Sequence, residues 1–206
     1  MAFEGFTGDF VGFFRGLEMD NSKSYFERHR RDYEQEIRAP MLALIEELAP
    51  GLGPPKLFRI NRDIRFSADK SPYKTNIAAM VGPLYIDLSA RHLFLGTGYY
   101  HADTRWLSRY RDAVGGPQGE ELARIVERGR AAGLSYGSED SLKTAPRGFS
   151  PDHPRIELLR WRNVVAGRMF EIEPWIATPA ARDRIVESWA MLKPFSQWLE
   201  ASVPAA

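Results

Sequence analysis

The first third of the chain carries apolar residues at helical spacing. In the segment TGDFVGFFRGLEM they recur three and four positions apart, which predicts an amphipathic helix capped by Thr7 or Asp9. The predicted inner face consists of Phe10, Phe13, Phe14 and Leu17. A second helical pattern covers residues 20–53 and is expected to end at Gly51 and Gly53. Pro40 should kink or split it, because proline lacks the N–H that a helix interior needs.

The middle of the chain alternates between apolar and polar residues, as strands do. Residues 57–66 show this period, and the segments NIAAMVG, LYIDLS and HLFLGTGYY follow with very short links. Short links join antiparallel neighbours. The pattern therefore predicts an antiparallel meander sheet of about four or more strands.

The last part of the chain returns to helical spacing in residues 103–133 and 178–202, with a short helix expected within residues 155–163. Residues 134–154 are rich in glycine, proline and serine. We expect a long functional loop or a small subsheet there, because structureless loops of this length are uncommon in compact domains. Helices, then strands, then helices predict one α+β domain over residues 1–206, with the N- and C-terminal helices packed on the sheet.

The amino-acid composition excludes several classes of function. The net charge is +1, so the whole molecule has no general attraction for nucleic acid or an anionic membrane. The absence of cysteine excludes thiol nucleophiles, disulfides and thiolate metal sites. No apolar run is long enough for a transmembrane helix, and the first residues lack the features of a signal peptide. We therefore expect a cytoplasmic protein that does not associate with membranes.

One residue breaks the pattern of the segment FRINRDIRFSADKSPYKTNI. Its predicted core face consists of the even positions Phe58, Ile60, Arg62, Ile64 and Phe66. Four of these are apolar and the fifth is Arg62, and a buried guanidinium is costly unless it is paired and hydrogen-bonded. Three explanations are open. A β-bulge near Asn61 turns Arg62 outward, Arg62 pairs with a buried carboxylate such as Asp87 or Glu27, or Arg62 lines a cavity at the edge of the core.

The polar face of the same segment concentrates positive charge. Residues 56–76 contain six cations and two aspartates, a net charge of +4 against +1 for the whole chain. Arginine presents planar fork donors that suit carboxylates and phosphates, so the segment is typical of an anion site. The alternative is a salt-bridged, solvated sheet face, which accounts for the outward charges but leaves Arg62 without an explanation.

The stretch RINRDIRFSADKSPY resembles the motif R-x-x-R-D-x-R-F-x-x-D-K-x-x-Y, which defines a widespread, mainly bacterial family of unknown function. NSKSYFERHR, GTGYY and LKTAPRGFSPDHP resemble flanking parts of the same family, with Ser22 and Tyr25 as departures. The resemblance carries no established activity. It implies that Lys143, Arg147 and His153 belong with the strand motif. From the residues alone, Lys143 and Arg147 can equally be solvated loop charges, and His153 can cap the start of a helix.

These patterns predict a protein that binds an anionic small molecule bearing phosphate or carboxylate. The predicted ligand contacts are Arg59, Arg62, Arg65, Lys70, Lys74, Lys143 and Arg147. The groups expected to orient them are Asp63, Asp69 and Tyr73. No catalytic residue, cofactor or metal is assigned, because the surrounding cations oppose a Mg²⁺ site built from the nearby aspartates. The alternatives are an enzyme acting on a phosphoester in the same pocket, and a nucleic-acid or protein-interaction module, of which nucleic acid is disfavoured by the balanced net charge.

Overall fold

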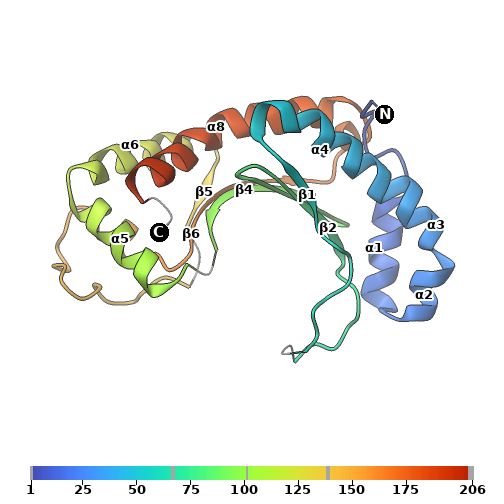
Figure 1. Cartoon of the computed structure of the whole chain (residues 1–206), viewed down its shortest axis with the longest axis horizontal. Helices are drawn as coiled ribbons and strands as arrows, with labels where there is room; N and C mark the ends of the chain where they lie inside the picture. The colour runs from blue at the N-terminus through green and yellow to red at the C-terminus, as the bar shows by residue number, and fades with distance from the viewer. Residues whose placement is uncertain (1, 66–67, 101, 138–139, 204–206) are drawn as a thin grey trace. The chain divides into compact units, whose positions relative to one another are not determined.

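The computed structural model describes residues 2–65, 68–100, 102–137 and 140–203 (Figure 1). The chain forms two compact units. The first comprises Met1–Leu95 and Met169–Glu187, and the second comprises Gly96–Arg168 and Ser188–Ala206. Every residue from 56 to 76 that the structure describes belongs to the first unit.

The strands form a six-stranded sheet in the order β1-β2-β3-β4-β6-β5. Their bounds are β1 Pro55–Leu57, β2 Asn76–Val81, β3 Leu84–Ser89, β4 His92–Tyr99, β5 Ser135–Tyr136 and β6 Val164–Glu171. The first four follow one another as neighbours, so the predicted meander and the α+β class are confirmed. β6 lies in a stretch for which the sequence pattern gave no assignment.

Five helical segments precede the sheet: α1 Phe10–Met19, α2 Lys23–Arg28, α3 Arg30–Asp32, the π-helix η1 Tyr33–Arg38 and α4 Ala39–Leu52. The carboxylate of Asp9 caps α1 by accepting a hydrogen bond of 2.8 Å from the Gly12 N–H. The expected split at Pro40 does not occur: the backbone stays helical through the proline, and only the hydrogen bonding changes from π to α geometry at Ala39. Gly53 ends α4 with φ of 120°, a conformation that side chains disfavour.

Within the first unit, the two faces of the sheet differ in chemistry. One face is apolar and fully buried, and α4 and α1 pack against β2 and β3. It consists of Ile77, Ala79, Val81, Leu84, Ile86 and Leu88. Because side chains alternate along a strand, the opposite face carries Asn76, Ala78, Met80, Tyr85 and Asp87. This second face provides the floor of the candidate site.

The predicted strand over residues 57–66 is mostly wrong as regular structure. Only β1 pairs as a strand, and an isolated bridge joins Asn61 to Tyr73. Leu57 pairs with Ala79, and Asn61 lies four positions after Leu57. Its partner Tyr73, however, lies six positions before Ala79. The register of the pairing therefore shifts by two residues between the two pairs. The predicted alternation nevertheless holds, because the even positions from 58 to 64 are less exposed than the odd ones from 59 to 65. Phe66 and Ser67 lie outside the described residues.

The second unit contains α5 Thr104–Gly115, α6 Gln118–Ala131 and α7 Ile156–Leu159. The C-terminal carbonyls of α5 are satisfied by Arg155, whose guanidinium donates to the carbonyl oxygens of Val114, Gly115 and Gly116. Two further elements are the 3₁₀ helix η2 Pro174–Ala177 and the long helix α8 Ala180–Ser202. None of the helices in the described part of the chain is long and apolar enough to cross a membrane.

Candidate functional site

A pocket of about 580 Å³ lies on the polar face of the sheet, beside the segment that follows β1. We call it the lysine pocket. Its lining residues are Phe58, Arg62, Asp63, Lys74, Asn76, Ala78 and Tyr85. All of them belong to the first unit. Its volume is within the range of small-molecule sites, which is about 300–1,000 Å³.

Lys74 is the central cation of this pocket. Its Nζ lies 5.7 Å from the centroid of the Phe58 ring, and the residue is partly buried. Burial lowers the pKa of Lys74, and the neighbouring charges of Arg59 and Arg62 lower it further, while Asp87 opposes them. Among the described residues, no acceptor forms a hydrogen bond or an ion pair with its ammonium group. The pocket therefore holds a positive charge that the protein leaves incompletely compensated.

Arg62 lines the same pocket and is paired. Its Nη1 donates to the Asp69 carboxylate, and its side chain is 35% exposed. Asp69 is itself fixed by the N–H of Ser71, at 2.9 Å. The partner is therefore neither Asp87 nor Glu27, because Glu27 binds Arg30. Of the three explanations for Arg62, the structure agrees with the one in which its side chain lines a cavity. Arg62 also pairs with a carboxylate, but this carboxylate, Asp69, is exposed rather than buried.

Asp87 is a buried carboxylate that does not line the lysine pocket itself but bonds two residues that do, Asn76 and Tyr85. It is 8% exposed and lies opposite Ala78 in the β2–β3 register. Its Oδ2 accepts hydrogen bonds from the Asn76 amide and from the Tyr85 hydroxyl, the latter at 3.1 Å. Its Oδ1 lies 3.4 Å from Nε2 of His92. Burial, followed by this carboxylate, raises the pKa of Tyr85, so the phenol stays protonated and donates.

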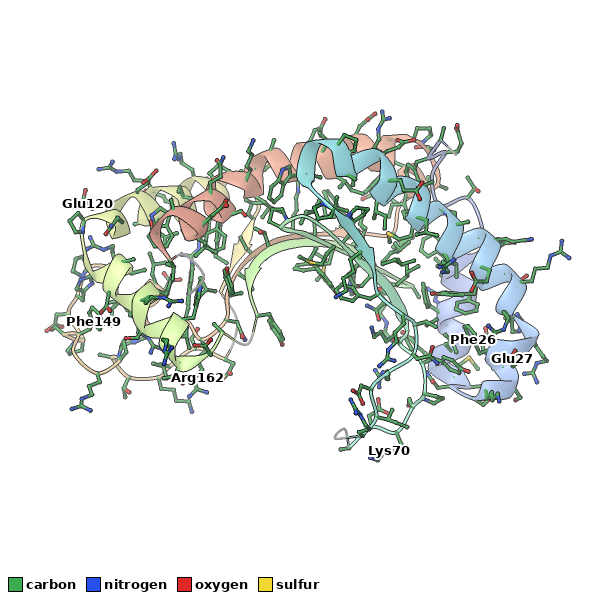
Figure 2. The ribbon with its side chains drawn as sticks, viewed as in Figure 1. Phe26, Glu27, Lys70, Glu120, Phe149 and Arg162 are labelled. Carbon is green, nitrogen blue, oxygen red and sulfur yellow. The ribbon has the colours of Figure 1, made fainter. Side chains whose placement is uncertain are left out.

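Three other predicted residues, Asp63, Arg65 and Lys70, form hydrogen bonds within the segment itself. Asp63 receives two hydrogen bonds from the Arg65 side chain, at 2.9 and 2.6 Å. Lys70 lies at the far end of the loop between β1 and β2 (Figure 2), and its Nζ donates to the Ile64 carbonyl oxygen at 3.0 Å. Hydrogen bonding to Arg65 lowers the pKa of Asp63. A carboxylate with a lowered pKa is a weak general base, which makes Asp63 poorly suited to proton abstraction.

The remaining predicted residues lie outside the lysine pocket. Arg59 and Tyr73 line a second pocket of the first unit. Lys143 and Arg147 are exposed and belong to the second unit. The structure thus brings Arg62, Asp63 and Lys74 together in one pocket.

Sequence reasoning did not assign Asn76 or Tyr85 to the site, although a usable signal existed. Alternation in LYIDLS puts Tyr85 and Asp87 on one face of β3, opposite its apolar residues. The pairings of Ala78 with Asp87 and of Met80 with Tyr85 then place that face beside β2. The register across the short β2–β3 turn would have located both residues.

His153 serves local structure. Its Nδ1 accepts a hydrogen bond of 3.0 Å from the Arg155 N–H, just before α7. The bonded N–H belongs to the N-cap residue of α7, and α7 has no side-chain cap, so His153 lies at the helix start without capping it. Within residues 2–65, 68–100, 102–137 and 140–203, no three His, Asp or Glu side chains are grouped as metal ligands.

A family of proteins matches most of the chain. The model of a family described as "Conserved hypothetical protein (DUF2461)" matches residues 9–198. No curated protein matches the chain. The match covers most of the sequence and includes every residue of the lysine pocket.

Proposed function

The chain belongs to this family of conserved hypothetical proteins, and we propose that it binds an anionic small molecule, bearing phosphate or carboxylate, in the lysine pocket. One observation carries the proposal. The partly buried ammonium of Lys74 has no hydrogen-bonded or ion-paired acceptor in the described part of the chain. A cation withdrawn from water without a partner is unfavourable, and an anionic ligand would supply the missing partner.

Arg62 adds directional donors to this charge. Only its Nη1 is bound to Asp69, so Nε and Nη2 have no acceptor among the described residues. A guanidinium held on one side by a carboxylate is fixed in orientation and can still donate on the other side. Lys74 would act as the point charge and Arg62 as the oriented donor for the same oxyanion.

The other walls suit the body of such a ligand. The rings of Phe58 and Tyr85 lie 6.3 Å apart, measured between centroids, and Ala78 adds a small apolar side chain to the lining. Small-molecule sites combine apolar walls with a few polar groups that fix orientation. Binding of an anion with an attached apolar or ring portion fits these walls better than binding of a bare ion.

A thermal-shift screen at low salt tests this function. Inorganic phosphate, sugar phosphates, nucleotides and small carboxylates are compared with neutral sugars at the same concentrations. We expect at least one anion to raise the melting temperature, because a ligand that binds only the native state stabilises it by mass action. The rise should shrink as salt is added, since the contact is between charges. If no anion raises the melting temperature at low salt, the proposal is wrong.

A further inference from the structure

We propose that the first unit carries a second binding site, separate from the lysine pocket, for a planar or aromatic compound that bears a phosphate or carboxylate group. The site is a pocket of about 330 Å³ between α2, η1 and the segment after β1. We call it the tyrosine pocket. Its functional lining consists of Tyr33, Tyr73, Arg30, Arg38, Arg59 and Phe26.

The hydroxyl groups of two tyrosines are the first evidence for this site. Tyr33 and Tyr73 are 3% and 6% exposed, and both line the pocket. Neither hydroxyl forms a hydrogen bond with any residue that the structure describes, and neither oxygen is fully enclosed, so both reach the surface of the pocket. Two hydroxyls that lie open on one pocket without a protein partner are available to donate hydrogen bonds to a ligand. Tyr73 is well fixed, because the Asn21 side chain bonds its N–H and its carbonyl oxygen, at 2.9 and 3.1 Å.

Three guanidinium groups supply the charge. Arg59 has no paired acceptor among the described residues. Arg38 pairs with Glu34 at 3.2 Å, and Arg30 pairs with Glu27, which is not part of the lining. Glu34 is the one carboxylate on the wall, so arginines outnumber carboxylates around the pocket. This balance favours an anion.

Each hydroxyl lies within the electrostatic range of a guanidinium. Burial raises the pKa of Tyr33 to about 12, with Glu34 raising it and Arg38 lowering it. The pKa of Arg30 is raised mainly by its hydrogen bond to Glu27, and Tyr73 contributes in the same direction. The phenol of Tyr33 stays neutral, so it and the guanidinium of Arg38 form a pair of donors, which is what an oxyanion accepts.

The aromatic floor selects the body of the ligand. The rings of Phe26 and Tyr73 stack 4.4 Å apart with an angle of 18° between their planes, and Arg30 lies 5.1 Å from the centroid of Phe26 (Figure 2 labels Phe26 on α2). Flat rings pack well on such surfaces. The wall opposite is the π-helix η1, a geometry that recurs at functional sites and that places Tyr33 and Arg38 on the same pocket.

The two pockets can be tested separately, because Phe58 is the one residue that lines both. Calorimetric titration with phenyl phosphate, with inorganic phosphate as comparison, reports on the aromatic selectivity. We expect phenyl phosphate to bind about 10-fold more tightly than phosphate, since ring stacking contributes about 1 kcal/mol or more. The double substitution Tyr33→Phe and Tyr73→Phe should reduce that affinity about 100-fold, because each of the two lost hydrogen bonds to an anion is worth about 10-fold.

The melting temperature of the double Phe variant distinguishes a ligand-binding role of the two hydroxyls from a structural role. Removing unpaired hydroxyls should leave the melting temperature of the ligand-free protein unchanged or raised. Arg31→Gln, on the neighbouring residue outside the pocket, is the matched control and should bind like the wild type. Unchanged affinity in the double Phe variant, or no binding of phenyl phosphate to the wild type, would overturn the second site. Loss of binding in Lys74→Gln with retention in the double Phe variant would place the ligand in the lysine pocket, which also overturns the second site while supporting the first.

Discussion

Replacing Lys74 by glutamine should weaken anion binding about 10- to 100-fold, because hydrogen bonds to charged groups contribute about 1.5–3 kcal/mol. The fold should tolerate the change. Glutamine keeps most of the stem that packs over Phe58, and it removes a partly buried charge that is repelled by Arg59 and Arg62. Isothermal titration with the best anion from the screen measures the affinity, and thermal unfolding measures the stability.

Lys56→Gln provides the matched control. Lys56 also lies over the Phe58 ring, with Nζ 5.3 Å from the centroid, but it does not line the lysine pocket. At physiological salt its substitution should leave anion affinity within about twofold of the wild type, since Lys56 is exposed and makes no contact in the pocket. Equal losses in the two variants would mean that a diffuse surface charge binds the anion, and the pocket assignment would be wrong.

The pH dependence of binding gives a further check on the Lys74 variant. Because the pKa of Lys74 is lowered, its ammonium loses the proton at a lower pH than an ordinary lysine. Affinity for an anion should therefore be full below that pKa and fall as the pH rises through it. The wild type should show this alkaline loss and Lys74→Gln should not.

Replacing Asp87 by alanine should destabilise the protein by about 2–4 kcal/mol, since it leaves several partly buried donors without an acceptor. The Asn76 amide and the Tyr85 hydroxyl lose their hydrogen bonds, and Nε2 of His92 loses its carboxylate neighbour. Urea denaturation measures the change in the free energy of unfolding, and an unchanged slope with denaturant shows that the folded state is otherwise intact.

Tyr85→Phe is the comparison for this prediction. It removes one donor and keeps Asp87 with its other neighbours, so it should cost no more than about 1.5 kcal/mol, the net value of one hydrogen bond. If Asp87→Ala costs less than Tyr85→Phe, the carboxylate is not the centre of the network. Asp87→Asn, which keeps an acceptor of similar shape, should lie between the two.

Local features were predictable because they depend on neighbours in the sequence. The cap at Asp9, the buried face of α1 and the end of α4 at Gly53 follow from residues within a turn or two. The same holds for the alternation of exposure from 58 to 65, which survives even though most of the segment is not a regular strand. Backbone geometry imposes these periods, so sequence alone determines them.

The chemistry of the site depended on contacts that local patterns do not specify. The strand register shifts by two residues between the Leu57–Ala79 pair and the Asn61–Tyr73 bridge. Arg59 and Arg62 lie close to this shift, and they line different pockets although they are only three positions apart.

The partners of the charged groups were decided in the same way. Arg62 meets Asp69 rather than Asp87, and Asp87 is buried beneath Tyr85 and Asn76 across two strands. The sequence determined that this segment is cationic and alternating. Tertiary structure decided which cations are neutralised and which face a pocket, because pairing depends on strand register and on side chains brought together from different strands.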